Sequence, residues 1–240
     1  MSALAHMLES RGLPTVVIGL VRPHLEAVRP PRAVFVPFQL GRPLGEPADA
    51  PFQRRVLMQA LGLLERRDGP VILEDFSDDA PGARDQAGWT PPVANGAADP
   101  ATPQDWAAFL AREMALLRPA WEQARRRSRG STVGVSAQPP EDWPGFMAGF
   151  MAGELPSVAA HATPALALRF LLDDLKAFYG EAAQANGPAP SSGQLDRWFW
   201  RQTIAGRFVI ALRATCLHAT NNALRTVAGR FFVPRPYLPD

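Results

Sequence analysis

The sequence predicts an α/β N-terminal part, with a short parallel sheet and covering helices over residues 1–76, followed by an all-α helical bundle over residues 104–240. Before residue 77, short uncharged apolar runs alternate with stretches of helical pattern. After residue 103, large apolar residues recur at the spacing of an amphipathic helix. The first pattern is typical of strands joined by helices, and the second is typical of a bundle.

Three strands are expected in the N-terminal part, at Thr15–Val21, Ala33–Phe38 and Val71–Leu73. Their apolar, largely β-branched runs indicate strands buried on both faces, as in a parallel sheet. Helical patterns surround Leu4, follow Pro23 and follow Asp49, which can cap the third helix. Because three strands make a narrow sheet, we expect the helical part or another chain to cover it.

Residues 77–103 are rich in Pro, Gly, Ala and Asp, which is the composition of a linker. Only Trp89 and Val93 offer bulky apolar surface there, so partial docking through Trp89 is expected. Beyond the linker, a periodic run from Trp106 to Trp121 predicts the first helix of a small bundle. The further helices are expected at Glu141–Met151, Ala165–Ala185, Leu195–His218 and Asn221–Phe232.

Composition excludes several classes of protein. With 47% hydrophobic and 20% charged residues, the chain is not intrinsically disordered. No apolar run reaches the length of a membrane span, and the first residues lack the pattern of a secretion signal. A net charge of +2 is too small to indicate nucleic-acid binding, and a single cysteine cannot form an internal disulfide. These features predict a cytoplasmic protein without a nucleic-acid or membrane partner.

A candidate substrate-binding site lies where the first two strands end. Ligands of open α/β sheets bind beyond the carboxyl ends of the strands. Arg22 follows the first strand, and the loop after the second strand carries Gly41, Arg42 and Gly45. The glycines permit a close approach of ligand to backbone, and arginine can bind a small carboxylate with two hydrogen bonds. The alternative interpretation is a rigid turn without ligand.

Other chemical signals are weaker. Glu74, Asp75, Asp78 and Asp79 follow the third strand, and we interpret them as solubilising loop charge rather than a metal site. The chain contains neither of the common glycine-rich nucleotide-binding patterns, so no metal or other cofactor is predicted. Cys216 lies in an apolar helical run, which predicts a buried, inert thiol.

Residues 2–76 resemble the C-terminal end of the selenoprotein B family, component B of the glycine, sarcosine, betaine and D-proline reductases. The similarity is carried in order by Gly-Leu-Pro-Thr at 12–15, Pro-Leu-Gly-Glu-Pro at 43–47 and Arg-Arg-Val at 54–56. It covers about a third of the chain. The resemblance implies reductive cleavage of a C–N bond in a small amino acid or amine derivative, started by attack of a cysteine or selenocysteine on carbon.

In that family the nucleophile precedes the segment that corresponds to residues 2–11, so no residue here inherits the role. The resemblance therefore implies a reductase subunit or fragment whose redox-active Cys or Sec lies upstream, with Met1 an internal start, or in a protein partner. The alternative is a non-catalytic binding or assembly protein that retains part of a reductase fold.

Overall fold

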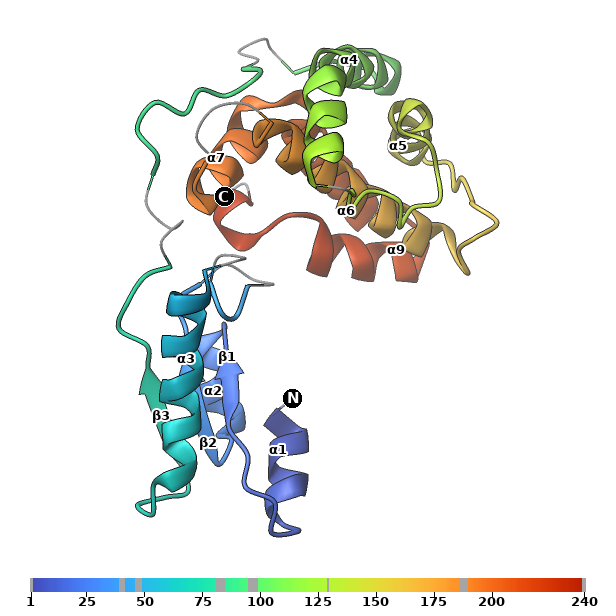
Figure 1. Cartoon of the computed structure of the whole chain (residues 1–240). Helices are drawn as coiled ribbons and strands as arrows, with labels where there is room; N and C mark the ends of the chain where they lie inside the picture. The colour runs from blue at the N-terminus through green and yellow to red at the C-terminus, as the bar shows by residue number, and fades with distance from the viewer. Residues whose placement is uncertain are drawn as a thin grey trace. The chain divides into compact units, whose positions relative to one another are not determined.

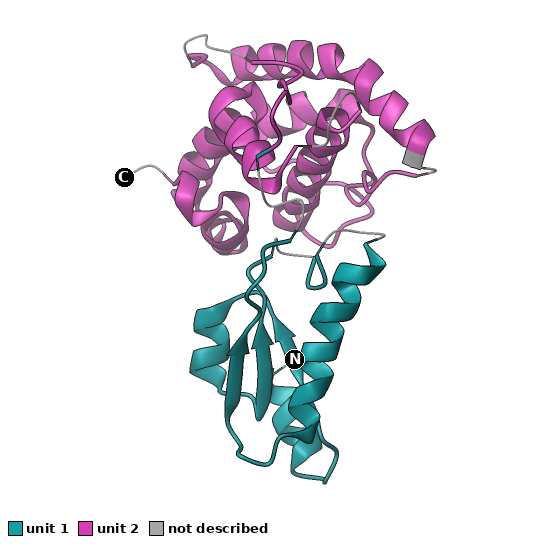
Figure 2. Cartoon of the chain, turned by 60° about the vertical axis from the view of Figure 1, so that its left-hand side comes forward, with its two compact units in different colours: residues 1–85 teal, residues 86–240 magenta. Residues whose placement is uncertain are grey.

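A computed structural model describes residues 2–38, 42–45, 49–80, 85–94, 99–128, 130–185 and 190–238. The chain divides into two compact units, residues 1–85 and residues 86–240 (Figure 2). The boundary falls inside the stretch expected to be a linker, and residues 86–94 belong to the helical unit.

The first unit is the expected α/β part, with a three-stranded parallel sheet in the order β1-β2-β3 (Figure 1). β1 and β2 are shorter than the apolar runs that predict them, whereas β3 extends beyond its run to Asp75. The elements are α1 (Ser2–Glu9), β1 (Val17–Gly19), α2 (Arg22–Val28), β2 (Arg32–Phe35), α3 (Ala50–Gly62) and β3 (Ile72–Asp75).

Helices α2 and α3 cover opposite faces of this sheet. On one face, Leu25 of α2 packs so closely on Gly19 that a Cβ there would lie 2.6 Å from the leucine side chain. On the other face, Phe52 and Val56 of α3 share a buried cluster with Val34 of β2. Figure 2 shows the strands between the two helices.

This arrangement has an unusual handedness. The strands lie side by side in chain order, so two crossovers of the same hand would place both helices on one face. Because α2 and α3 lie on opposite faces, the two crossovers have opposite hands, whereas nearly all such connections are right-handed. Each face of the sheet is consequently covered by only one of the connecting helices.

The carboxyl end of the sheet is fixed by three aromatic rings. Phe38 follows β2, Phe76 follows β3, and Phe52 lies in the first turn of α3. Their ring centroids are 5.4 to 5.7 Å apart in tilted or edge-to-face geometry, which is favourable for aromatic pairs. The side chain of Asp49 accepts a hydrogen bond from the Phe52 backbone N–H, as the sequence predicts for a helix cap.

The second unit is helical, and the described residues after 104 contain no strand. This confirms the predicted bundle. Among the described residues no helix is long and apolar enough to cross a membrane. The α-helices are α4 (Pro103–Ser128), α5 (Trp143–Met151), α6 (Pro164–Ala183), α7 (Ser192–Gln202), α8 (Ile204–Leu217) and α9 (Asn222–Val227).

One predicted helix is wrong: Leu195–His218 is not continuous but breaks at Thr203. Thr203 has extended backbone angles (φ −110°, ψ 152°), and its hydroxyl accepts a hydrogen bond from the Gly206 N–H, so it caps α8. Gly206 permits the sharp bend, since a Cβ there would lie 2.0 Å from the Phe199 carbonyl oxygen. A capping threonine followed three residues later by glycine therefore overrides an apolar periodicity that runs through the break.

The segment before α4 docks on the bundle, as expected for Trp89. The Trp89 indole N–H donates to the Ala183 carbonyl at 3.3 Å, and its ring lies 6.2 Å from that of Trp198. Trp198 in turn donates to the Val93 carbonyl at 2.5 Å. These contacts explain why residues 86–94 belong to the helical unit.

A buried carboxylate on α6 organises the connection between α4 and α5. Asp174 is fully buried and accepts hydrogen bonds from the backbone N–H groups of Gly134, Val135 and Ser136 at 2.8 to 3.1 Å. The Ser136 hydroxyl donates a further bond at 2.5 Å. Because burial of an unsatisfied charge costs several kcal/mol, these four bonds fix the loop against α6.

A second buried carboxylate, Glu113 of α4, joins three helices. It accepts hydrogen bonds from the Tyr179 hydroxyl at 2.7 Å and from the N–H groups of Ile204 and Ala205 at 2.9 and 3.2 Å. These are N–H groups of the first turn of α8, which a helix cannot satisfy by itself. Burial raises the pKa of Glu113 above its ordinary value, and these bonds oppose the rise.

We predict that Asp174→Asn lowers the free energy of unfolding of the helical unit by about 2–4 kcal/mol, because an NH2 group would then face backbone donors. All six tryptophans lie in residues 86–240, so urea unfolding followed by tryptophan fluorescence measures this unit. Asp173→Asn is the matched control. Asp173 is partly exposed and paired with Arg169 and Lys176, so its loss should cost less than about 1 kcal/mol. Equal effects of the two substitutions would contradict the anchoring role of Asp174.

Candidate functional site

Arg22, the first residue of α2, lies at the carboxyl end of the sheet as the sequence predicts. Its guanidinium pairs with Asp75 at the end of β3 and, at 2.9 Å, with Glu26 one turn along α2. It also lies over the ring of Phe35, 5.7 Å from the centroid. The hydrogen bond to Asp75 raises the pKa of Arg22 above its ordinary value. Arg22 is thus held in place but remains 40% exposed.

The predicted loop site is described in part. Gly41 lies outside the described residues, and Arg42 is half-buried. Gly45 is buried with a φ of +85°, and a Cβ there would lie 2.7 Å from the Phe52 ring. Both the positive φ and the close packing require glycine at this position, which supports the interpretation of this loop as a rigid turn.

Arg22 and Gly45 lie at the same end of the sheet but not on the same face. Arg22 packs with Phe35 on the face that α2 covers, whereas Gly45 packs with Phe52 on the face that α3 covers. The structure therefore does not gather these two predicted residues around one ligand position. Arg22 has a different partner at this end, the carboxylate of Asp75.

The carboxylates after the third strand are engaged by arginines. Besides Asp75, Glu74 pairs with Arg66, and Asp78 pairs with Arg55 at 2.7 Å. In the described part of the chain, no group of three His, Cys, Asp or Glu side chains is placed to hold a metal ion. The ion pairs agree with the interpretation of these residues as surface charge.

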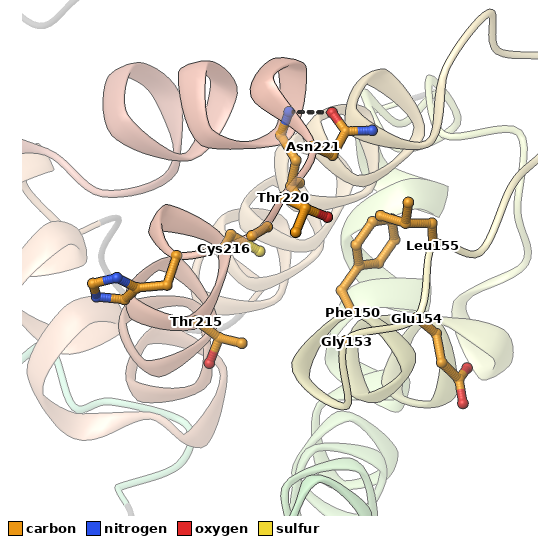
Figure 3. A pocket seen from close by; sticks show the side chains of 11 residues that line it. Phe150, Gly153, Glu154, Leu155, Thr215, Cys216, Thr220 and Asn221 are labelled. Atoms are coloured by element: carbon orange, nitrogen blue, oxygen red, sulfur yellow. Dashed lines mark hydrogen bonds between the residues drawn. The ribbon is translucent and has the colours of Figure 1, made fainter.

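A cavity of about 360 Å³ lies in the helical unit between the end of α5 and the segment that joins α8 to α9 (Figure 3). Phe150, Leu155 and Leu224 contribute apolar surface, and Thr215 and Thr220 contribute hydroxyl groups. The lining residues come from two segments about 60 positions apart in the chain, so no local sequence pattern reveals this cavity.

Cys216 contributes to the wall of this cavity but is only 1% exposed. Burial raises the pKa of its thiol to about 12. The nucleophilic form is the thiolate, which is therefore scarce at neutral pH. Asn221, another lining residue, uses its side-chain oxygen to cap α9 through the Leu224 N–H at 3.0 Å, the dashed line in Figure 3. The cavity thus offers a binding surface without an activated nucleophile.

Comparison of the chain with protein-family models, with curated proteins and with solved structures finds no match. The interpretation of the site therefore depends on the residues themselves. Among them, Arg22 and Asp75 form an exposed ion pair at the carboxyl end of a parallel sheet, where ligands of such sheets bind.

We predict that Cys216 reacts slowly in the folded protein. Raising a thiol pKa from 9.0 to about 12 reduces the thiolate fraction at pH 8 from about one tenth to about one ten-thousandth, and burial also hinders access. Ellman's reagent should label the native chain over hours and the chain in guanidinium chloride within minutes. Fast stoichiometric labelling of the native chain would show that Cys216 is accessible and activated.

Proposed function

We propose that the α/β unit is the substrate-facing part of a selenoprotein B-like reductase, and that another polypeptide segment supplies the nucleophilic thiol or selenol. One observation supports the proposal: the stretch that we interpret as resembling this family, residues 2–76, lies within one compact α/β unit, residues 1–85. The proposed resemblance therefore concerns a structural unit and not an arbitrary piece of the chain.

The chemistry needs few groups from this unit. A thiolate or selenolate attacks the carbon that bears the amino group, the C–N bond breaks, and the amine leaves with a proton. A dithiol then attacks the sulfur or selenium, the bond from that atom to carbon breaks, and the carbon takes up a proton. The second thiol of the dithiol releases the nucleophile and closes a disulfide, so that the dithiol is oxidised and the substrate carbon is reduced. The α/β unit contains no cysteine, since Cys216 is the single one in the chain. Its task in this reaction is to bind and orient the substrate.

The Arg22–Asp75 pair fits the substrates of such a reaction. Small amino acids are zwitterions at neutral pH, with a carboxylate and an ammonium group on neighbouring carbons. A guanidinium has five N–H donors, and the bonds to Glu26 and Asp75 use only Nε and Nη1. We propose that Nη2 donates to the substrate carboxylate, while the Asp75 carboxylate, 55% exposed, attracts the ammonium group. The pair carries one positive and one negative charge, so it favours a zwitterion over a simple anion.

We predict that the full chain binds sarcosine more tightly than acetate or dimethylammonium, each of which carries only one of the two charges. Arg22→Gln should weaken sarcosine binding about tenfold, the effect of losing one charge-assisted hydrogen bond. Isothermal titration measures both effects. Arg55→Gln is the matched control, because Arg55 is also exposed and paired with an aspartate at this end of the sheet, but on α3. Equal losses in the two variants would contradict a site at Arg22.

We predict that the chain alone, with dithiothreitol as reductant, does not release ammonia or amine from glycine, sarcosine or betaine and does not open the ring of D-proline. The physical reason is the lack of an activated thiol, given the burial of Cys216. Turnover that is lost in Cys216→Ser would place the nucleophile in the helical unit and contradict the proposal.

The genomic DNA upstream of the Met1 codon tests the source of the nucleophile. An in-frame TGA or a Cys-x-x-Cys codon pattern there identifies the segment to co-express, with recovery of turnover as the expected result. If no such segment or neighbouring gene restores turnover, the chain is a non-catalytic binding protein with part of a reductase fold.

A further inference from the structure

The two edges of the three-stranded sheet differ in charge. β3 and the turn before it carry Glu74, Asp75, Arg66 and Asp68, which form ion pairs at that edge. At the other edge, no charged residue occurs from Leu13 to Val21. Charged side chains are a common means of preventing an edge strand from pairing with another chain. The edge at β3 has this protection and the edge at β1 lacks it.

The backbone of β1 offers hydrogen-bonding groups at this edge. The Gly19 carbonyl accepts from the Val36 N–H, so Gly19 faces β2. Because successive residues of a strand in a parallel ladder direct their backbone groups to alternate sides, the N–H and carbonyl of Ile18 face away from β2.

The apolar surface beside β1 is incompletely covered. Val16, Ile18 and Leu20 pack against the buried cluster under α3 but are only half-buried themselves. On the other face, α1 contacts α2 and leaves Leu4 and Met7 45% and 48% exposed. Figure 1 shows α1 on the β1 side of the sheet, away from β3.

We propose that the open edge of β1 pairs with a strand of a partner polypeptide, and that this strand is uncharged and apolar on both faces. Its backbone would bond to the outward groups of β1, and its side chains would extend the half-buried surface on one face and meet the exposed residues of α1 on the other. Addition of a strand to a sheet edge is a common mode of peptide recognition. The proposal holds whatever chemistry the partner brings, and for the proposed reductase it gives the place where the thiol- or selenol-bearing segment pairs.

The test uses the full chain and a fluorescent peptide, KKTVIVTVKK, whose centre is apolar on both faces. Fluorescence anisotropy should show saturable binding at micromolar chain concentrations. A matched peptide, KKTEIETEKK, carries charge on alternate residues and should bind about tenfold more weakly or not at all. Equal binding of both peptides, or no binding of either, would overturn the proposal.

Two substitutions locate the peptide. Ile18→Lys places a charge on β1 and should weaken binding about tenfold, whereas Leu73→Lys, the matched change of a half-buried residue on β3, should change it less than about twofold. An equal effect of both would overturn the assignment to β1. In the unmodified chain, hydrogen exchange gives a second measurement that needs no variant: the peptide should protect the outward amides of β1, that of Ile18 above all, and leave those of residues 72–75 unchanged.

Sedimentation of the chain without peptide distinguishes a second copy as the occupant. A monomer that binds the apolar peptide supports a heterologous partner. A dimer that Ile18→Lys dissociates would assign the edge to a second copy and overturn the proposal. None of these measurements depends on turnover, so their failure leaves the proposed reductase function standing and their success does not establish it.

Discussion

The need to satisfy buried carboxylates determines how the helical unit is built. Asp174 is fully buried in α6, and an unpaired charge in such a position would cost several kcal/mol. The backbone of residues 134–136 supplies the compensating hydrogen bonds, so the chain between α4 and α5 must return to α6. One turn and a half further along α6, Tyr179 donates to Glu113, which in turn binds the N–H groups that begin α8. The loop between α4 and α5, the contact of α6 with α4 and the start of α8 thus depend on polar groups that lie within the apolar core.

Much of the fold follows from local sequence, because alternation of apolar runs with helical periodicity distinguishes the two units. The break at Thr203 was not predictable from periodicity, since apolar residues continue through it and only the threonine–glycine pair at Thr203 and Gly206 indicates a new helix start. The contacts of the buried acidic residues were not predictable from local sequence either. Glu113 and Asp174 stand among apolar residues of their helices, a local signal that they are buried, but their hydrogen-bond partners are 38 to 92 positions away in the chain.

The sequence predicts that the candidate site lies at the carboxyl end of the sheet, but it does not predict the ion pair of Arg22 with Asp75. Arg22 and Asp75 each follow or end a strand, and in a parallel sheet the carboxyl ends of the strands meet at one edge. Their ion pair joins residues 53 positions apart and depends on β1 and β3 both flanking β2, which the sequence does not specify. Gly45 illustrates the opposite case. The sequence left open whether Gly45 contacts a ligand or forms a rigid turn, and the backbone angle and the close Phe52 ring give a structural reason for the glycine.

The two units differ in how completely each buries its own apolar side chains. Among the described residues, eight of the fourteen exposed large apolar side chains belong to residues 2–85, although this unit is about half the length of the other. The helical unit encloses a continuous aromatic and aliphatic core and fixes its loops by buried hydrogen bonds. The α/β unit has one connecting helix on each face, and one edge of its sheet lacks charges.

An apolar surface like that of the α/β unit is stabilised when a partner covers it. Since the carboxyl end of a widened parallel sheet would include the neighbouring strand, the same pairing would bring groups of the partner toward Arg22 and Asp75. Pairing at β1 would then widen the sheet and change the surroundings of Arg22 and Asp75 in a single event.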